Sequence, residues 1–441
     1  MSFKMSELVI KKARIVLPGK VFEGDIGIDS GRISKIGRGL SGDETYDAEG
    51  KYVIPGLIDA HVHFREPGAS EKEDWITGSS AAAAGGVTTV LEMPNTKPPT
   101  VTKELLEEKR TAYASRSIVN YGFHFGAAAG NEGELRKIDR IASVKFYLGS
   151  TTGGLLVESD STLFEQLKIL AERDILATAH AESEPLISLA TNKLRAAGRN
   201  DLESYSESRP NAAAAEAANR MIGFSKKAGS RLHICHVSTR EEVGILAMRR
   251  KELPLTAEAS PHHLFLTKED YKELGTLAKV NPPLRSKEDQ KALWKALSDG
   301  TIDMIATDHA PHLLKEKKLG IWDAPSGVPG LETMLPLLLN EVNAGRLTIG
   351  QVSKLTSENP AKIFRIGNKG GIKEGYDADL VVVDMNMEKE VDGKKLYTKC
   401  KWSPFAGRSL KGWPVMTFVS GRLVFDRGKI KKNKGEEVSY V

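Results

Sequence analysis

The sequence has little cysteine, no long hydrophobic run and no concentration of one charge. Only Cys235 and Cys400 are present, which excludes a disulfide framework and fits a reducing compartment. No stretch reaches the roughly 18 apolar residues that a membrane span requires, and the N-terminus has no apolar core of signal-peptide length. The net charge of +5 comes without a basic tail, so it mildly favours an anionic substrate. We therefore expect a cytoplasmic protein with neither a nucleic-acid nor a membrane partner.

The two ends of the chain share a β-rich texture. Val and Ile recur between turn signals in short segments at 7–17, 21–28 and 32–36, and again at 378–384 and 415–425. Ser420-Gly421 is a hairpin signal within the last of these. Because no helical pattern accompanies either end, we expect 1–54 and 367–441 to pair into one small β-sandwich domain built from both termini.

Between these ends, strands alternate with helical patterns, which predicts parallel βαβ units. We expect eight strands, at 57–63, 87–93, 120–126, 142–148, 174–180, 231–237, 255–260 and 303–308. Helices are expected at 72–84, 102–115, 158–172, 184–197, 211–228, 240–251, 286–299 and 330–344. Eight strand and helix units predict an α/β fold in which residues 55–366 form a (β/α)8 TIM-type barrel.

The first of these strands ends in an unusual polar motif. In the run from Ile54 to Gly68, strand alternation places His61, His63 and Arg65 on one face. Two imidazoles on one face suit a metal, and the guanidinium of Arg65 could hold a planar anion beside it. An isolated His-x-His pair is more often chance or a polar strand edge, so a metal site needs further ligands from elsewhere.

Further polar residues fall where the other predicted strands end, at the mouth where such barrels place their chemistry. They are Asn95 after strand two, Lys145 within strand four, His180 after strand five, His236 after strand six and Asp308 after strand eight. Strand parity puts His233 and His236 on opposite faces, and we assign His236 to the barrel mouth and His233 to packing. By the same count, Cys235 faces away from His236 as a buried thiol.

These side chains form a ligand list of four imidazoles, one carboxylate and one amine. A lysine in an apolar strand is costly unless it is paired or altered, and reaction with carbon dioxide would turn Lys145 into an anionic carbamate that can bridge two ions. The alternative is a lysine that extends to the barrel mouth. Nitrogen and oxygen ligands suit zinc, and two ions bridged by hydroxide provide a nucleophile at neutral pH. We therefore expect a hydrolase.

Four motifs together resemble the amidohydrolase superfamily, and within it the dihydroorotase family. They are His61 to Gly68, Met93-Pro94-Asn95-Thr96, the Lys145 strand and Thr307 to His312, and the similarity extends over nearly the whole chain. The resemblance implies His61 and His63 on one zinc ion, His180 and His236 on the second, carboxylated Lys145 and hydroxide between them, and Asp308 as ligand and general acid/base. It further implies substrate contacts from Arg65, Asn95, His312 and, less securely, Asn281.

The reaction implied is the reversible hydrolysis of dihydroorotate to N-carbamoyl-L-aspartate in pyrimidine synthesis. An allantoinase or a hydantoinase (dihydropyrimidinase) would share the fold and metals but has no need for Arg65, and a non-catalytic relative has no reason to keep all the ligands. Some dihydroorotases carry aspartate in place of the bridging lysine, so the metal count depends on Lys145. The sequence leaves open the metal identity, a homo-oligomer or an association with another pyrimidine enzyme, and whether 313–322, a predicted surface loop, closes over substrate.

Overall fold

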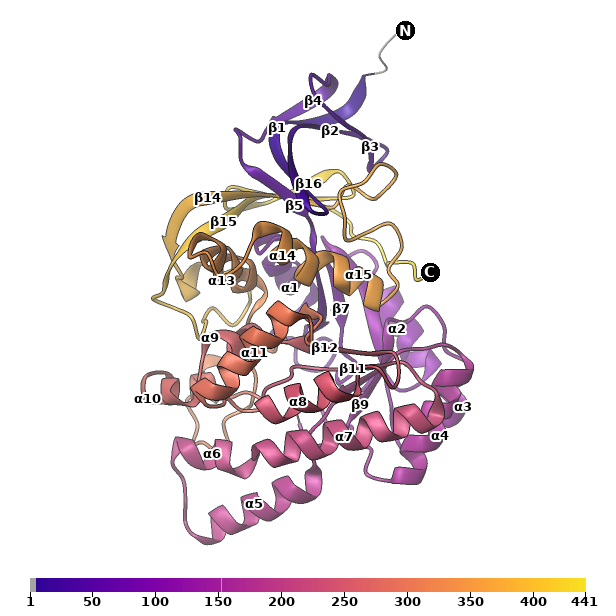
Figure 1. Ribbon diagram of the computed structural model, residues 1–441, viewed down its shortest axis with the longest axis vertical. Coiled ribbons are helices and arrows are strands. Elements are labelled where there is room, and N and C mark those ends of the chain that lie inside the picture. The colour runs from indigo at the N-terminus through magenta and orange to yellow at the C-terminus, as the bar shows by residue number, and fades with distance from the viewer. Residues whose placement is uncertain (1–4, 152) are drawn as a thin grey trace.

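The computed structural model of the protein describes residues 5–151 and 153–441. Residues 1–4, with which the predicted N-terminal part begins, lie outside the described residues. In Figure 1 the strands of both chain ends lie at the top, and the central part of the chain, with its helices outermost, lies below.

The middle of the chain forms a sheet of eight parallel strands, each beside its neighbour in sequence, from β6 to β13. The strands are β6 (Leu57–Val62), β7 (Val87–Glu92), β8 (Asn120–Gly126), β9 (Ser143–Tyr147), β10 (Ala177–His180), β11 (Leu232–Ile234), β12 (Leu255–Ala259) and β13 (Met304–Ile305). The main helices between them are α1 (Trp75–Ala84), α2 (Lys103–Tyr113), α4 (Asp160–Glu172), α5 (Glu184–Ala196), α7 (Asn211–Ala228), α8 (Arg240–Arg249), α11 (Lys287–Asp299) and α13 (Leu331–Asn343). The predicted barrel, with its eight strands and eight helices, is confirmed.

The ring closes between its first and last strands through residues that follow β13. His309 forms a parallel bridge with Val62, and its carbonyl accepts a hydrogen bond from the His63 amide at 2.8 Å. Four residues before His63, the buried Asp59 carboxylate on β6 accepts hydrogen bonds from the amide and the hydroxyl of Thr307. Because β13 itself is only two residues long, these contacts fix the strand that carries Asp308 against the strand that carries the two histidines.

Shorter helices occupy the connections between the main elements. They are α3 (Glu132–Leu135), α6 (Leu202–Ser208), α9 (Pro261–Phe265), α10 (Tyr271–Leu274), α12 (Leu314–Lys317), α14 (Ile349–Ser353) and α15 (Asn359–Ile363), with short 3-10 or π turns at Lys268–Asp270, Gly275–Ala278, Lys354–Glu358 and Gly393–Lys395. The expectation of a surface loop at 313–322 is wrong in part, because α12 forms there and Lys317 is fully buried.

Both chain ends meet in one mixed sheet of nine strands. These are β1 (Ser6–Leu17), β2 (Lys20–Asp29), β3 (Arg32–Gly37), β4 (Gly42–Asp47), β5 (Tyr52–Pro55), β14 (Leu380–Glu390), β15 (Ser409–Val419), β16 (Arg422–Asp426) and β17 (Lys429–Ile430). β5 joins the two ends, since it pairs in parallel with β1 and antiparallel with β14. Buried residues of both ends, such as Ile10, Ile26 and Phe418, form a separate hydrophobic core. The predicted small β domain from both termini is confirmed.

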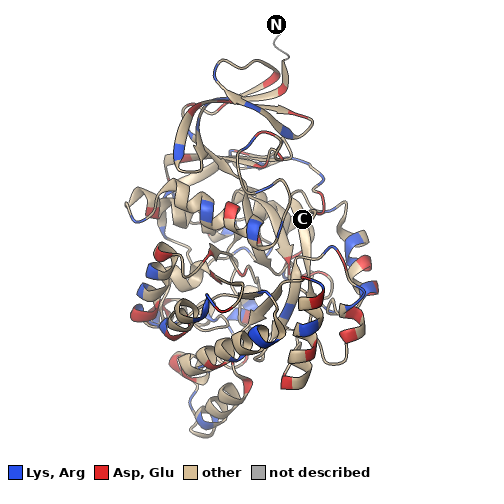
Figure 2. Cartoon of the chain, turned by 45° about the vertical axis from the view of Figure 1, so that its right-hand side comes forward, with Lys and Arg blue, Asp and Glu red and all other residues tan. Residues whose placement is uncertain are grey.

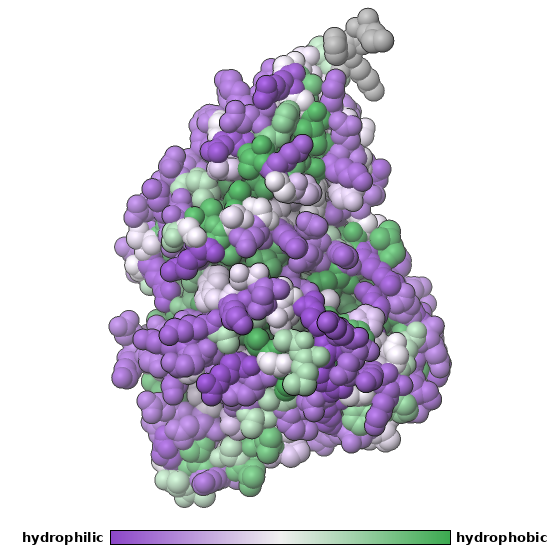
Figure 3. All heavy atoms as spheres, viewed as in Figure 1, coloured by the Kyte–Doolittle hydropathy of each residue, from purple (hydrophilic) through white to green (hydrophobic). Residues whose placement is uncertain are grey.

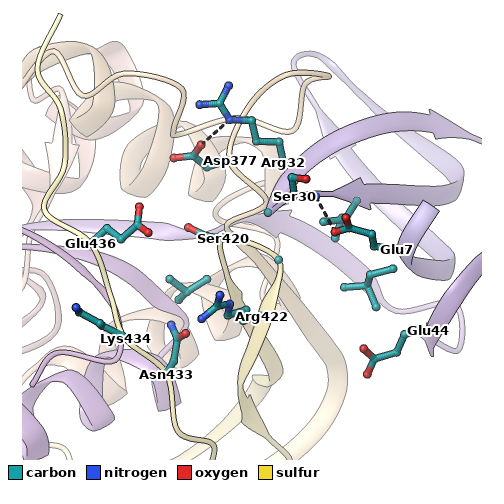
Figure 4. A pocket seen from close by; sticks show the side chains of 15 residues that line it. Glu7, Ser30, Arg32, Glu44, Asp377, Ser420, Arg422, Asn433, Lys434 and Glu436 are labelled. Carbon is teal, nitrogen blue, oxygen red and sulfur yellow. Dashed lines mark hydrogen bonds and ion pairs between the residues drawn. The ribbon is translucent and has the colours of Figure 1, made fainter. Parts of the chain in front are cut away.

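Side chains from both ends also line a polar pocket beside this sheet (Figure 4). Glu7 Oε2 accepts a hydrogen bond from the Ser30 amide at 2.8 Å, and Arg32 Nε lies 3.7 Å from Asp377 Oδ1. The lining side chains carry charges of both signs, among them Glu436 and Arg422. The contact between Arg32 and Asp377 ties the C-terminal part of the chain to the N-terminal strands.

Residues of both charges share the surface, and hydrophobic side chains gather on one part of it. Basic and acidic residues are interspersed along the outer helices (Figure 2). Hydrophobic side chains gather on the terminal domain in Figure 3, whereas hydrophilic ones cover much of the rest of that face. Among the described helices, none has both the length and the apolar character needed to cross a membrane.

Candidate functional site

The structure brings nine of the ten predicted site residues to the wall of one cavity at the C-terminal ends of the barrel strands, which we call the central cavity. The nine are His61, His63, Arg65, Asn95, Lys145, His180, His236, Asn281 and Asp308. Tyr147, Thr151, Ala310, Ser326 and Gly327 complete the wall. The tenth, His312, is 1% exposed and lies behind Arg65, with its Nε2 3.0 Å from the guanidinium Nη2.

Asp308 lies between the two histidines of the first strand. Its Oδ1 is 3.1 Å from His63 Nε2 and 3.4 Å from His61 Nε2. Burial opposes the charge on Asp308, but His61 and His63 hold the pKa of this carboxyl well below its usual range. Burial also lowers the pKa of His63 to about 4. Asp308 is therefore ionised beside a neutral His63. Although burial opposes its charge, Glu258 and Asp308 raise the pKa of His61 to about 10, so a metal ion bound at this ring would displace a proton.

His180 and His236 form a second pair. His180 Nδ1 lies 3.1 Å from His236 Nε2, and burial lowers the pKa of both rings. Four ligands placed tetrahedrally about zinc, at about 2.0 to 2.1 Å, stand roughly 3.3 to 3.4 Å apart, so this spacing fits two ligands of one ion. His61, His236 and Asp308 also present ligand atoms within 4.8 Å of one another. The donor set and its spacing fit a metal centre.

Lys145 is fully buried on β9, and its amine donates to Cys235 Sγ at 2.9 Å. Cys235 Sγ also lies within 4.8 Å of ligand atoms of His61 and Glu258. The thiol is buried as predicted, and it lies beside Lys145 and His61 of the site. His233 and Cys235 both lie beside Glu258, so alternation holds as far as Cys235 and ends at His236, whose φ is 36°.

Three site residues adopt left-handed backbone conformations directly after their strands. The φ angles are 61° at Arg65, 36° at His236 and 48° at Asp308. Such angles are uncommon for residues with a side chain, and they gather at functional sites where the surroundings enforce them. At these positions the chain leaves the strand and turns, so that the side chain reaches the cavity wall.

Arg65 lies in a buried corner beside His312 and Lys72. Its Nε donates to the Pro311 carbonyl at 3.1 Å, and no carboxylate of the described residues lies within 4.0 Å of its guanidinium. His312 Nε2 is 3.0 Å from Arg65 Nη2, while Lys72 Nζ is 3.3 Å from His312 Nδ1. Burial keeps the pKa of His312 well below its usual range, and a neutral imidazole accepts at only one nitrogen. Lys72 has its own carboxylate partner, since Glu316 Oε1 lies 3.0 Å from its Nζ. Arg65 has no carboxylate within 4.0 Å among the described residues, so its guanidinium suits an anionic ligand.

The comparisons with known proteins agree with this geometry. The model of the amidohydrolase family matches residues 52–424. The chain belongs to the amidohydrolase family. A dihydroorotase of Halobacterium salinarum is 42% identical over 418 residues, which cover 94% of this chain and 96% of that protein. A dihydroorotase of Methanosarcina acetivorans is 40% identical over 447 residues, which cover 98% and 94%.

Similar solved structures carry a different name. The L-hydantoinase (dihydropyrimidinase) from Arthrobacter aurescens matches with a TM-score of 0.95 and 33% identity, covering 99% of this chain and all of that one. Sequence relatives and structural neighbours of this amidohydrolase thus differ in the substrate that their names imply. The substrate has to be argued from the site itself.

The sequence patterns did not predict two buried carboxylates that contact the histidines of this amidohydrolase. Glu258, on β12, lies 2.5 Å from His61 Nδ1 and also 3.1 Å from His233 Nε2. Glu182 lies 2.9 Å from His180 Nε2. A carboxylate on the far nitrogen of a metal-binding histidine fixes the tautomer and the ring orientation. The signal in the sequence is an acidic residue inside an apolar strand (Leu255–Ala259) and another two places after His180.

Asn95 and Arg209 complete this outer layer. Asn95 Oδ1 is 2.7 Å from His63 Nδ1, so the amide holds a predicted ligand in place. Arg209 donates to both oxygens of Glu182, with the shortest contact at 2.5 Å. Burial disfavours the charge on Glu182, but Arg209 outweighs it and holds the pKa of Glu182 well below its usual range. Glu182 therefore stays ionised as the partner of His180, while His233 is confirmed as a packing residue between Thr256 and Glu258.

Proposed function

We propose that the chain is a dihydroorotase, a metal-dependent hydrolase that reversibly opens the ring amide of dihydroorotate to give N-carbamoyl-L-aspartate. The observation that carries the proposal is the buried Arg65 guanidinium on the cavity wall, with no carboxylate of the described residues within 4.0 Å, since dihydroorotate bears a ring carboxylate and hydantoin does not. The sequence relatives named dihydroorotase support the same reading. In pyrimidine synthesis the reaction would run as ring closure.

We assign the metal-binding roles to the six residues of the ligand list. His61 and His63 would hold one ion, His180 and His236 the second, and Lys145, as a carbamate, would bridge them with Asp308 as a further ligand. We expect zinc, two ions per chain, because the donors are nitrogen and oxygen atoms. Ions bound there would polarise the amide carbonyl and activate water as the nucleophile at neutral pH.

The remaining steps belong to the side chains of the cavity. Asp308, held ionised by His61 and His63, takes the proton from the attacking water and passes it to the ring nitrogen as the amide bond breaks. Arg65 pairs with the substrate carboxylate through two parallel hydrogen bonds. Asn281 faces the substrate from the opposite loop, Asn95 keeps His63 in place, and His312 supports Arg65 from behind.

A hydantoinase or dihydropyrimidinase activity is the second candidate, favoured by the likeness to the solved hydantoinase. A substrate panel decides between the two. Purified metal-loaded protein is assayed with dihydroorotate, hydantoin, dihydrouracil and allantoin, and kcat/KM is compared across them. We expect dihydroorotate to be turned over fastest by a wide margin. Faster turnover of any uncharged ring would assign the chain to the second candidate instead.

A further inference from the structure

One lysine of the segment after β13 differs from its neighbours. Lys315 and Lys318 are exposed, whereas Lys317 is 0% exposed. The Lys317 amine donates to three carbonyls: Lys279 O at 2.9 Å, Pro325 O at 3.0 Å and Gly327 O at 3.1 Å. No carboxylate of the described residues lies within 4.0 Å of it. Although burial lowers the pKa of Lys317, three carbonyl acceptors are matched only by the three N–H donors of the ammonium form.

A second buried lysine holds the same loop. Lys279 is 4% exposed, and its amine donates to Ile321 O at 2.6 Å and Ala324 O at 2.5 Å. Its backbone carbonyl accepts from the Gly327 amide at 3.0 Å as well as from Lys317. Four of the five carbonyls that the two amines bind therefore belong to residues 321–327. Burying an amine costs free energy unless its N–H donors are hydrogen-bonded. Each lysine is therefore stable in its buried position only while these carbonyls stay gathered around its amine.

The carbonyls gathered in this way lie directly behind the wall of the central cavity. Ser326 and Gly327 line the cavity, and so does Asn281, two residues beyond Lys279. The Tyr205 hydroxyl donates to Asn281 Oδ1 and lies 2.7 Å from Ser326 Oγ, while Ser326 O lies 3.0 Å from His312 Nε2. At Gly327, with φ of +136°, a Cβ would stand 2.5 Å from the Ala310 carbonyl. Backbone therefore forms much of this wall, and the carbonyl contacts of the two lysines hold it together with the Tyr205 hydroxyl and the bond from the Ala310 amide to the Val328 carbonyl.

We propose that Lys317 is a positioning residue for the substrate side of the site: its ammonium fixes the 325–327 wall against the segment that carries Asn281. The role of this wall in binding the substrate ring rests on the proposed function. Lys317 does not touch the cavity itself. Its loss should loosen the wall and weaken substrate binding, with little effect on the metal ligands or on Asp308.

The test compares Lys317→Met with Lys315→Met and Lys318→Met, which remove exposed lysines of the same segment. We expect Lys317→Met to raise KM for dihydroorotate roughly tenfold or more, as loss of hydrogen bonds to a charged group implies, while kcat changes only a few-fold. Metal content should match wild type, and both control variants should behave as wild type. In Lys317→Ala, added ethylammonium should lower KM again, because a free cation can bind the three carbonyls.

Several outcomes would overturn the proposal. They are a KM in Lys317→Met equal to that of the controls, a fall in kcat with KM unchanged, or a loss of bound metal. If Lys317→Met fails to fold, Lys279→Met provides the second measurement and should show the same rise in KM; failure of both to fold would assign the lysines to stability alone. If wild type prefers another cyclic amide, the proposed function fails, and the same KM comparison is made with that substrate.

Discussion

At the scale of single residues, Arg65 has a buried charge without a carboxylate partner within 4.0 Å among the described residues. Removing one partner of a buried charged pair costs about 2 to 5 kcal/mol, or roughly 30-fold to several thousand-fold. We expect Arg65→Met to lower kcat/KM for dihydroorotate by that factor with the metal content unchanged. Arg65→Lys should not restore it, because an ammonium cannot reproduce the planar fork of donors.

Residual turnover of uncharged rings gives the control for Arg65. Any slow hydrolysis of dihydrouracil by wild type should persist in Arg65→Met, since that ring brings no carboxylate to the corner. Steady-state kinetics of both variants with both substrates provide the measurement. An unchanged kcat/KM for dihydroorotate would show that Arg65 does not recognise the substrate.

We propose that Asp308 is both a metal ligand and the general acid/base, because it lies beside His61 and His63 and faces the cavity. Asp308→Asn keeps the shape but removes the base, so we expect kcat to fall by about 10² to 10⁴, the range of general acid–base catalysis. Binding of substrate should persist, as measured by calorimetry with the metal-loaded variant. Near wild-type turnover in this variant would mean that another residue carries out the proton transfer.

At the scale of elements, the sequence patterns located the barrel strands because both faces of each strand are buried, which leaves nearly continuous apolar runs. The patterns overestimated the last strands. β11 was expected at 231–237 and β13 at 303–308, yet they span Leu232–Ile234 and Met304–Ile305. In both cases the chain turns into a left-handed conformation at a proposed ligand, His236 or Asp308, and hydropathy does not indicate that turn.

Pairings between distant elements were also beyond the sequence patterns. His61 was predicted as a ligand, but its partner Glu258 stands 197 positions later on β12. In the sequence Glu258 is visible only as an acidic residue inside an apolar strand, and nothing near it identifies His61 as its partner. Only the closed ring of strands brings the two together. The same holds for Lys317, which the local pattern of charged residues placed on the surface.

The first turn of α13 contains a buried acid that predicts a pH effect. Glu332 accepts hydrogen bonds from the amides of Tyr397 and Thr398, and burial raises its pKa to about 7. Between pH 4.5 and 7 the folded protein therefore binds more protons at this group than the unfolded chain, so its contribution to stability falls as pH rises. At about 1.4 kcal/mol per pKa unit, the change is on the order of 3 kcal/mol.

Glu332→Gln keeps an acceptor for these amides and removes the titration. We expect the melting temperature of the variant, relative to that of wild type, to increase as the pH rises from 5 to 8. Glu288→Gln, in the exposed first turn of α11, is the matched control and should keep a constant gap from wild type. A constant gap for Glu332→Gln as well would contradict the assigned pH effect.

At the scale of the whole molecule, the proposed metal ligands lie on or just after five separate strands, from His61 on β6 to Asp308 after β13. Ions bound there would cross-link the first and last strands of the ring, where hydrogen bonding is sparsest, since β13 spans two residues. A ligand that binds only the folded state adds about 4 kcal/mol of stability at a thousandfold excess over its Kd. Metal loading should therefore stabilise the whole barrel as well as activate it.

The last prediction is that chelation abolishes turnover and lowers the melting temperature by several degrees, and that zinc restores both. Metal analysis of the loaded wild type should approach two ions per chain. Lys145→Ala should bind less metal and show a smaller shift on chelation, and short carboxylic acids, which can occupy the space of the carbamate, should restore part of its turnover. Lys109→Ala offers a control, because Lys109 is also buried but contacts Glu92 outside the cavity lining. Full activity and an unchanged melting temperature in metal-free protein would rule out the metal centre, whatever substrate the corner at Arg65 selects.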